Sequence, residues 1–90
     1  MLESIEIIIR GKVQGVFYRA TANQVAARIG ITGITRNQPD GTVYIIATGT
    51  TEQLEEFKDW CWEGSPDAVV SHVEVRKIPL QQFSDFRTIR

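Results

Sequence analysis

Two glycines and an arginine within one short segment have the chemistry to bind an anion. The segment, from Gly11 to Arg19, reads Gly-Lys-Val-Gln-Gly-Val-Phe-Tyr-Arg. Glycine allows backbone conformations in which several N–H groups point toward one anion, and the Arg19 guanidinium can pair with two oxygens of a phosphate. The spacing is neither that of a Walker loop nor Gly-x-Gly-x-x-Gly, and a connection whose glycines only turn the chain explains it equally well.

The segments on either side of this loop are predicted to be a strand and a helix. Residues 5–9 read Ile-Glu-Ile-Ile-Ile, a β-branched run of strand length. Ala22, Val25, Ala26 and Ile29 recur at the spacing of one helix face. The first turn of a helix has N–H groups without partners inside the helix, and the helix dipole favours negative charge there. A loop that leads into a helix is therefore well placed to hold an anion.

Length and composition are those of a soluble protein with one domain over residues 1–90. The hydrophobic share is 42% and the charged share 23%, which suits a modest core without a disulfide or metal. No apolar run is long enough to span a bilayer, and Met1-Leu2-Glu3 does not begin a signal peptide. The single cysteine cannot form an intrachain disulfide, so we expect a cytoplasmic protein with no membrane partner.

The charge distribution favours a small anionic ligand over a nucleic acid. The net charge is −1, which argues against non-specific binding to nucleic acid. Residues 1–45 contain five Lys or Arg against three acidic residues, whereas residues 46–90 contain five against eight. The positive excess lies in the half that contains the 11–19 loop, and it is too small for a long polyanion.

Periodicity and turn residues predict the order of elements along the chain. A strand is expected over residues 4–12 and a helix from residues 17–20 to Gly30, followed by strands over 31–37 and 42–48 around the turn Pro39-Asp40-Gly41. Thr50 and Gln53 form a capping box that opens a second helix, which Gly64-Ser65-Pro66 ends. A strand over 69–78 and a short one within 83–90, of unassigned register, complete the chain. The prediction is an α+β, ferredoxin-like βαββαβ sandwich, in which two helices cover one face of an antiparallel sheet.

This topology predicts that a second polar group lies near the loop. The first two strands would be parallel with the third between them, so their carboxyl ends share one edge of the sheet, about 10 Å apart. Asn37 ends the second strand, and its amide can both donate to and accept from a water molecule. RNA binding on such a sheet requires exposed aromatic residues on the central strands, where the sequence provides only Tyr44.

Several stretches of the chain together resemble the acylphosphatase family. They are residues 11–19, Gly30-Ile31-Thr32-Gly33, Asn37, Asp40-Gly41, Gly64-Ser65-Pro66, the strand that contains Val73, and Asp85-Phe86. The most specific part is Val13-Gln14-Gly15-Val16 with Arg19, and the resemblance covers nearly the whole chain. It implies hydrolysis of an acyl phosphate to a carboxylate and inorganic phosphate, without a metal or any other cofactor.

The resemblance also implies roles for individual residues. Arg19 would bind the substrate phosphate, and Asn37 would hold and orient the attacking water. The phosphate cradle would be completed by the backbone amides of Gln14, Gly15, Val16, Phe17, Tyr18 and Arg19. The chain departs from the family where an aromatic residue and a valine are usual, at Ile34 and Thr35, and where phenylalanine is usual, at Tyr18. None of these is a proposed catalytic group, although Ile34 could loosen the packing that aims Asn37.

A non-catalytic module that binds phosphate or acyl phosphate on the same fold is the alternative to an enzyme. The presence of both Arg19 and Asn37 favours the enzyme. Other reactive side chains are predicted to be structural, with His72 on a strand surface and Cys61 on the apolar face of the second helix. One cysteine and one histidine cannot assemble a zinc site from Cys and His ligands. We expect a monomer that acts on a small-molecule acyl phosphate.

Overall fold

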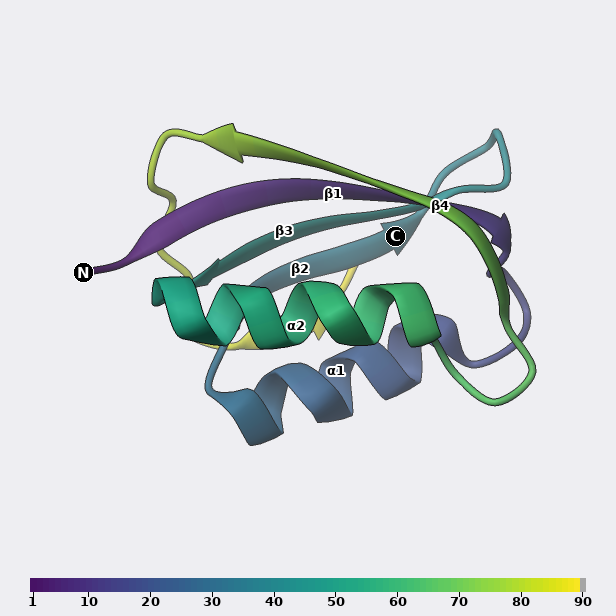
Figure 1. Ribbon diagram of the computed structural model, residues 1–90, viewed down its shortest axis with the longest axis horizontal. Coiled ribbons are helices and arrows are strands. Elements are labelled where there is room, and N and C mark those ends of the chain that lie inside the picture. Colours follow the sequence, from purple (N-terminus) through teal and green to yellow (C-terminus); the bar gives the residue numbers. More distant parts are fainter. Residues whose placement is uncertain (90) are drawn as a thin grey trace.

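The computed structural model describes residues 1–89, in which two helices pack on a five-stranded sheet (Figure 1). The elements follow in the order β1 (Glu3–Lys12), α1 (Tyr18–Ile29), β2 (Thr32–Asn37), β3 (Val43–Gly49), α2 (Thr51–Glu63), β4 (Val69–Ile78) and β5 (Phe86–Thr88). The predicted βαββαβ order is confirmed. Within the range predicted for the last strand, Arg90 lies outside the described residues.

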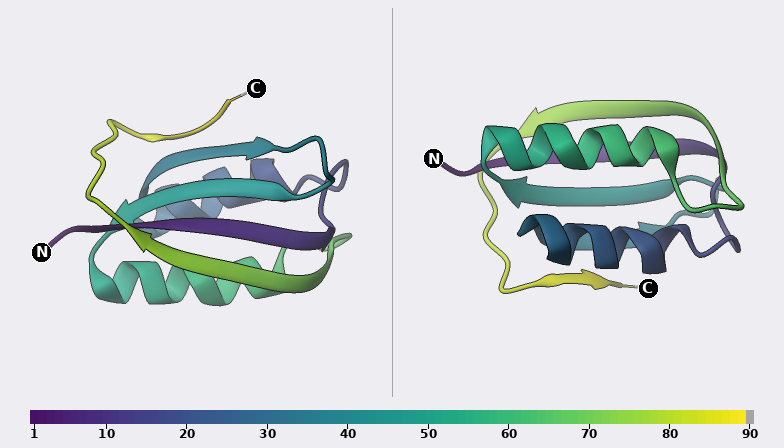
Figure 2. Two further views of the ribbon diagram at one scale, coloured as in Figure 1. Left: turned by 90° about the horizontal axis from the view of Figure 1, so that it is seen from above. Right: turned by 60° about the horizontal axis from the view of Figure 1, so that its bottom comes forward.

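The strands form one sheet in the order β4-β1-β3-β2-β5, and both helices cover the same face (Figure 2). Four of these strands pair antiparallel, as predicted, but β5 pairs parallel with β2. The sheet is therefore mixed rather than wholly antiparallel. The register that the sequence left open places Phe86 opposite Gly33 and Thr88 opposite Thr35.

The hydrophobic core lies between the sheet and the helices. Ile7 and Ile9 of β1 are fully buried, while Glu6 and Ile8 alternate with them on the other face. On α2, Leu54, Phe57 and Cys61 form the buried face that the sequence predicted. The alternation on β1 is that of a sheet with one covered face. In the part of the chain that the structure describes, no helix has the length and apolar character needed to cross a membrane.

Local signals in the sequence set the ends of both helices. Helix α1 ends at Gly30, whose φ of 98° is in the left-handed region that glycine adopts at a helix C-terminus. Helix α2 begins with the predicted capping box, in which the Gln53 N–H donates to Thr50 Oγ1 and the Thr50 N–H donates to Gln53 Oε1. The Gln53 side chain also donates to the Ile29 carbonyl, which joins the start of α2 to the end of α1.

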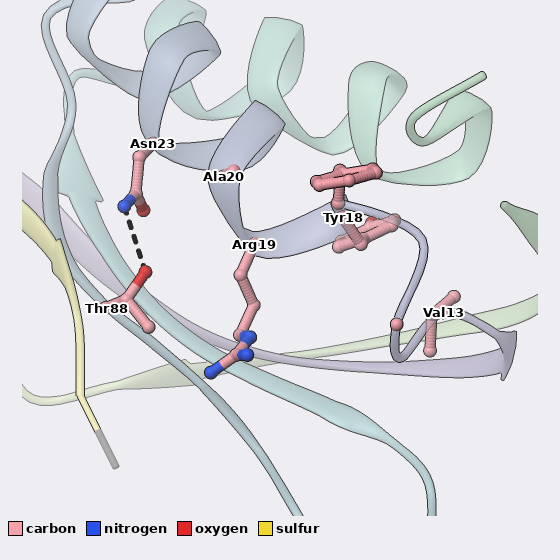
Figure 3. A pocket seen from close by; sticks show the side chains of 8 residues that line it. Val13, Tyr18, Arg19, Ala20, Asn23 and Thr88 are labelled. Carbon is pink, nitrogen blue, oxygen red and sulfur yellow. Dashed lines mark hydrogen bonds between the residues drawn. The ribbon is translucent and has the colours of Figure 1, made fainter. Parts of the chain in front are cut away.

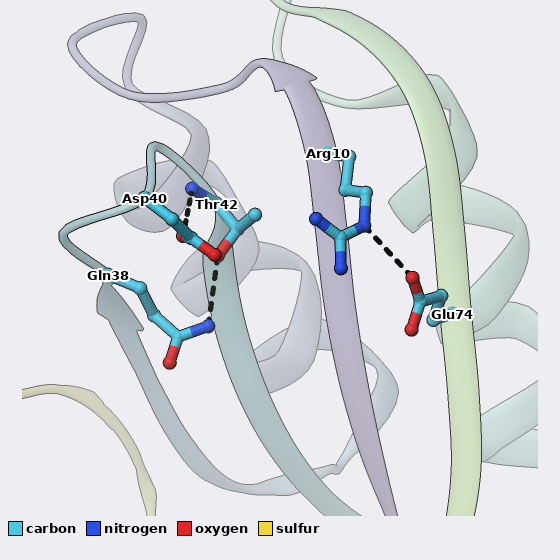
Figure 4. Close-up of polar contacts among 5 residues, drawn as sticks. All are labelled: Arg10, Gln38, Asp40, Thr42 and Glu74. Carbon is cyan, nitrogen blue, oxygen red and sulfur yellow. Dashed lines mark hydrogen bonds and ion pairs between the residues drawn. The ribbon is translucent and has the colours of Figure 1, made fainter.

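The connection between β2 and β3 is held by the side chain of Asp40 (Figure 4). Its Oδ1 accepts hydrogen bonds from the Thr42 N–H at 3.0 Å and from the Thr42 hydroxyl at 2.6 Å. The Gln38 side chain donates to the same Thr42 hydroxyl at 2.9 Å. The two bonds from Thr42 hold the Asp40 pKa below its usual value, because they stabilise the ionised carboxylate. The turn that follows Asn37 is therefore fixed by its own side chains.

Candidate functional site

The loop between β1 and α1 has the backbone conformation of an anion-binding nest. Gly15 has a φ of 73° and Phe17 a φ of 64°, and within residues 1–89 Phe17 is the only residue other than glycine with positive φ. Gln14, Val16 and Tyr18 therefore have φ of the opposite sign. Alternation between these two regions turns successive N–H groups toward the same side of the chain. The sequence predicts an anion cradle here, and the alternating signs of φ are compatible with one.

The backbone N–H groups of this loop take no part in the turn and cap hydrogen bonds of residues 1–89. The turn, loop and cap hydrogen bonds within residues 1–89 include none donated by the backbone N–H groups of residues 14–19. Phe17, the residue before α1, provides no side-chain cap, and the first turn of the helix contains no acidic residue. The positive end of the α1 dipole therefore has no negative side chain of its own at this point.

A pocket of about 380 Å³ opens beside the loop (Figure 3). Its lining residues are Val13, Gly15, Phe17, Tyr18, Arg19, Ala20, Asn23 and Thr88. Four residues predicted to form the cradle are among them, whereas Gln14, Val16 and Asn37 are not. Figure 3 shows Arg19 and Asn23 both extending from α1 toward the strands, with Asn23 bonded to Thr88.

Arg19 differs from the other arginines in the described part of the chain. Arg10, Arg28, Arg76 and Arg87 each form an ion pair with a carboxylate. The guanidinium of Arg36 lies over the Tyr44 ring, 5.0 Å from its centroid. Arg19 has neither kind of partner within residues 1–89. A half-buried guanidinium of this kind, next to unused N–H groups, can pair with an anion.

The side chain of Gln14 anchors the loop to the β2–β3 turn rather than facing the pocket. Its Nε2 donates to the Gln38 carbonyl at 2.8 Å and to the Thr42 carbonyl at 2.9 Å. Gln38 directly follows Asn37, so this bridge connects the cradle to the neighbourhood of the predicted water-binding residue. The sequence did not predict this contact, because it depends on how two distant loops meet.

Two further hydrogen bonds tie the loop to the end of α2. The Ser65 hydroxyl donates to the Val16 carbonyl at 2.7 Å, and the buried Tyr18 hydroxyl donates to the Cys61 carbonyl, also at 2.7 Å. Burial raises the pKa of Tyr18, so its hydroxyl remains a donor at ordinary pH. The side chain of Tyr18 therefore belongs to the core, and only its backbone can face an anion. These anchors hold the loop against the C-terminal end of α2.

Asn37 lies at the edge of the sheet that the sequence predicted. Strands β1 and β2 both pair antiparallel with β3, so they are parallel, and their last residues, Lys12 and Asn37, lie at the same edge. Asn37 is opposite Val43, on the face of the sheet that the helices cover. Its Oδ1 is buried and has no hydrogen-bond partner within residues 1–89.

The structure adds Asn23 and Thr88 to the residues around the site. The Asn23 Nδ2 donates to Thr88 Oγ1 at 2.9 Å. The sequence contained a signal for Asn23, because it lies one helical turn after Arg19 and so on the same face of α1. It contained none for Thr88, because the position of β5 depends on its pairing with β2.

The remaining reactive side chains have structural surroundings. His72 is exposed and contacts the Trp62 ring edge to face, with centroids 5.9 Å apart. Cys61 is fully buried, and this burial raises the pKa of its thiol to about 12. No group of three or more His, Cys, Asp or Glu side chains in residues 1–89 is arranged to hold a metal ion.

Comparison with known proteins gives one family over nearly the whole chain. Residues 5–88 match the model of the acylphosphatase family. A protein of Marinobacter nauticus named acylphosphatase is 48% identical over 83 residues, which cover 91% of this chain and 90% of the relative. An acylphosphatase of Methylococcus capsulatus is 37% identical over 90 residues, which cover 99% of this chain and 98% of the relative.

Solved structures give the same result. The structure of an acylphosphatase from Coxiella burnetii matches with a TM-score of 0.94 and 35% identity, covering 98% of this chain and 93% of that one. The crystal structure of acylphosphatase from Bacillus subtilis matches with a TM-score of 0.95 and 31% identity over the whole of both chains. The likeness therefore extends over the complete fold.

Proposed function

Since the chain belongs to the acylphosphatase family, we propose that its 14–19 loop and Arg19 bind the phosphate of an acyl phosphate while Asn37 orients the attacking water. The activity itself is hydrolysis of the acyl phosphate to a carboxylate and inorganic phosphate. A module that only binds its ligand is not favoured, because the relatives matched over 90% and 98% of their own length are named acylphosphatases. The observation that supports the residue roles is that, within residues 1–89, unused N–H groups lie beside a guanidinium without an acidic partner.

The chemistry of an acyl phosphate suits this small set of groups. The leaving group is a carboxylate, whose conjugate acid has a pKa of about 4, so it departs without protonation by a general acid. Phosphoryl transfer then depends mainly on positioning and on stabilising the charge of the three equatorial phosphate oxygens. N–H groups that are already oriented can stabilise that charge without rearrangement during the reaction.

The two catalytic residues would act on different parts of the reaction. The fork of Arg19 pairs with two phosphate oxygens in both the bound substrate and the transition state, so its loss impairs binding and turnover together. Asn37 holds the water in line with the breaking bond, so its loss lowers turnover more than phosphate affinity. No general base is assigned, and we propose that an oxygen of the substrate phosphate accepts the proton of the attacking water.

Phosphate release from acetyl phosphate, measured with excess chelator, tests these roles. Arg19→Ala should lower kcat and weaken inhibition by inorganic phosphate. Asn37→Ala should lower kcat by roughly 100-fold, the usual order for a lost positioning or electrostatic group, and leave phosphate inhibition nearly unchanged. Arg28→Ala is the control for Arg19, because it removes an exposed α1 arginine that pairs with Glu56. Arg36→Ala is the control for Asn37, because Arg36 faces the opposite side of β2 and stacks on Tyr44.

Three results would contradict the proposal. Activity that chelator removes would contradict a reaction without metal. Turnover of Asn37→Ala equal to that of the wild type would remove the water-orienting role. Phosphate inhibition unaffected by Arg19→Ala would remove the phosphate-binding role.

We further propose that the protein works as a monomer in the cytoplasm on a small-molecule substrate, without a nucleic-acid partner. The site is formed by elements of one chain, and the net charge of −1 gives little attraction for a polyanion. Light scattering that returned twice the 10.2 kDa chain mass would contradict the monomer.

A further inference from the structure

Three buried polar atoms beside the site have no hydrogen-bond partner within residues 1–89. They are Asn23 Oδ1, Thr35 Oγ1 and Asn37 Oδ1. Buried polar atoms in folded proteins are nearly all paired with protein or with ordered water, because an unpaired one costs free energy. Thr35 is completely buried, so bulk solvent cannot supply the partner. The three atoms lie on two adjoining elements, α1 and β2, so a single partner is the simplest explanation for all of them.

The register of the strands places Asn23 and Thr35 at the same level of the fold. Thr35 of β2 is paired with Thr88 of β5, and Asn23 of α1 donates to the Thr88 hydroxyl. Figure 3 shows this contact from α1 across to β5. Both Thr35 and Asn37 occupy the helix-covered face of β2, since side chains two residues apart on a strand share a face.

The catalytic residues form a second level nearer the edge of the sheet. Helix α1 starts at the edge of the sheet where β2 ends. Arg19 is therefore nearer to this edge than Asn23, and Asn37 is nearer to it than Thr35. One helical turn advances about 5.4 Å, and two strand residues advance about 6.6 Å. Arg19 and Asn37 therefore form the outer level, and Asn23 and Thr35 form the inner level directly beneath it.

We propose that one buried water molecule joins the three atoms, and that Thr35 acts through it as a positioning residue for Asn37. The donors and acceptors match: the water donates to the amide oxygens of Asn23 and Asn37 and accepts the hydroxyl proton of Thr35. Three hydrogen bonds are typical of a buried water. With this arrangement none of the three atoms remains unpaired.

The water fixes the orientation of the Asn37 amide. Its Oδ1 is held inward by the water, so its Nδ2 is turned outward and donates to the attacking water. This step rests on the proposed function, in which Asn37 orients that water. Thr35 does not touch the substrate, and its effect is confined to how often the Asn37 amide has the productive orientation.

Thr35→Val tests the proposal, because it keeps the branched shape of the side chain and replaces the hydroxyl by a methyl group. We expect kcat for acetyl phosphate to fall about five- to tenfold, the effect of losing roughly one hydrogen bond. KM and the inhibition constant of inorganic phosphate should stay within twofold of wild type. Thr35→Ser, which keeps the hydroxyl, should retain most of the wild-type kcat.

Thr48→Val is the matched control, because it makes the same chemical change at a buried threonine far from the site. Thr48 lies opposite Ser4, near the start of β1, and bonds to Ser4 and to the Gln81 carbonyl. It should lower the thermal unfolding temperature and leave kcat within twofold. A Thr35→Val variant with unchanged kcat would overturn the positioning role. A Thr35→Ser variant that loses as much kcat as Thr35→Val would overturn it as well.

A high-resolution crystal structure tests whether the water is present, independently of any activity measurement. Density should appear within about 3.2 Å of Thr35 Oγ1 and both amide oxygens, and it should disappear in Thr35→Val. A wild-type map without this water overturns the proposal. The proposed function fails separately, if Asn37→Ala keeps full turnover. Turnover lost in Asn37→Ala and kept in Thr35→Val leaves Asn37 in its role and removes Thr35.

Discussion

At the scale of single residues, the site contains one residue, Phe17, whose backbone conformation is unfavourable for a residue with a side chain. Phe17 has left-handed φ and ψ of 64° and 20°, a region that costs a residue with a Cβ roughly 1–2 kcal/mol. Its side chain is 76% exposed, so little packing offsets the cost. The conformation continues the alternation of φ signs that starts at Gly15, an alternation that suits the proposed anion-binding loop. The sequence contains no signal for it, because the left-handed region is a conformation that glycine, and rarely phenylalanine, adopts.

Replacing Phe17 by asparagine should stabilise the protein. Asparagine tolerates the left-handed region, so Phe17→Asn should raise the free energy of unfolding by about 0.5–1 kcal/mol, measured in urea. Leu80→Asn is the control, because Leu80 is also exposed but has no positive φ. Equal changes in the two variants would show that the removal of an exposed apolar side chain, rather than relief of backbone strain, is responsible.

The side chain of Tyr18 is expected to stabilise the fold, whereas only its backbone N–H is proposed to bind phosphate. Its hydroxyl satisfies a carbonyl in the last turn of α2, and its ring lies 5.0 Å from that of Trp60. Tyr18→Phe leaves the Cys61 carbonyl buried without that partner, so we expect a loss of about 1–2 kcal/mol in the free energy of unfolding. Because the backbone of residue 18 is unchanged, kcat should stay within about threefold. A large fall in kcat with no loss of stability would assign the hydroxyl to catalysis.

At the scale of elements, helices and strands were predictable where their signals are local. The reciprocal bonds of Thr50 and Gln53 and the left-handed Gly30 follow from residue types that lie next to one another in the chain. The position of β5 was not predictable, because it depends on pairing with β2 some fifty residues away. The anchors from Gln14 and Ser65 are contacts of the same long-range kind.

The β2–β3 turn makes stability depend on pH through Asp40. Its pKa is lowered in the folded state by hydrogen bonds from the Thr42 hydroxyl and N–H, in that order of size. The stabilisation is therefore fully present above the unfolded value of 3.8 and is lost as pH falls through the folded value. The advantage in unfolding temperature of wild type over Asp40→Asn should be largest near pH 6 and should shrink as the pH falls below 3.8.

Asp59→Asn controls for the loss of one negative charge on this acidic protein. Asp59 is exposed on α2, away from the turn. A difference between wild type and Asp40→Asn that is the same at pH 3 and pH 6 would show that shape, rather than ionisation, matters at this position.

At the scale of the whole molecule, the fold brings together groups that no short motif contains. The parallel relation of β1 and β2 could be predicted from element order, and with it the shared edge of the 11–19 loop and Asn37. The polar level of Asn23 and Thr35 beneath that edge could not, because it requires the register of α1, β2 and β5 together. The 11–19 loop can thus be predicted from neighbouring residues in the sequence. The residues beneath it can be identified only from the folded structure.

Phosphate binding should therefore stabilise the entire fold, because the cradle is tied to both helices and to the β2–β3 turn. At a phosphate concentration ten times its Kd, binding to the folded state adds about 1.4 kcal/mol to the free energy of unfolding. For a chain of this size, that corresponds to a rise in Tm of roughly 6–11 °C. The rise should saturate with the same constant that describes phosphate inhibition of turnover. Arg19→Ala should abolish the saturable part, whereas Arg28→Ala should keep it; a rise that is equal in both variants would reflect a general salt effect and not the site.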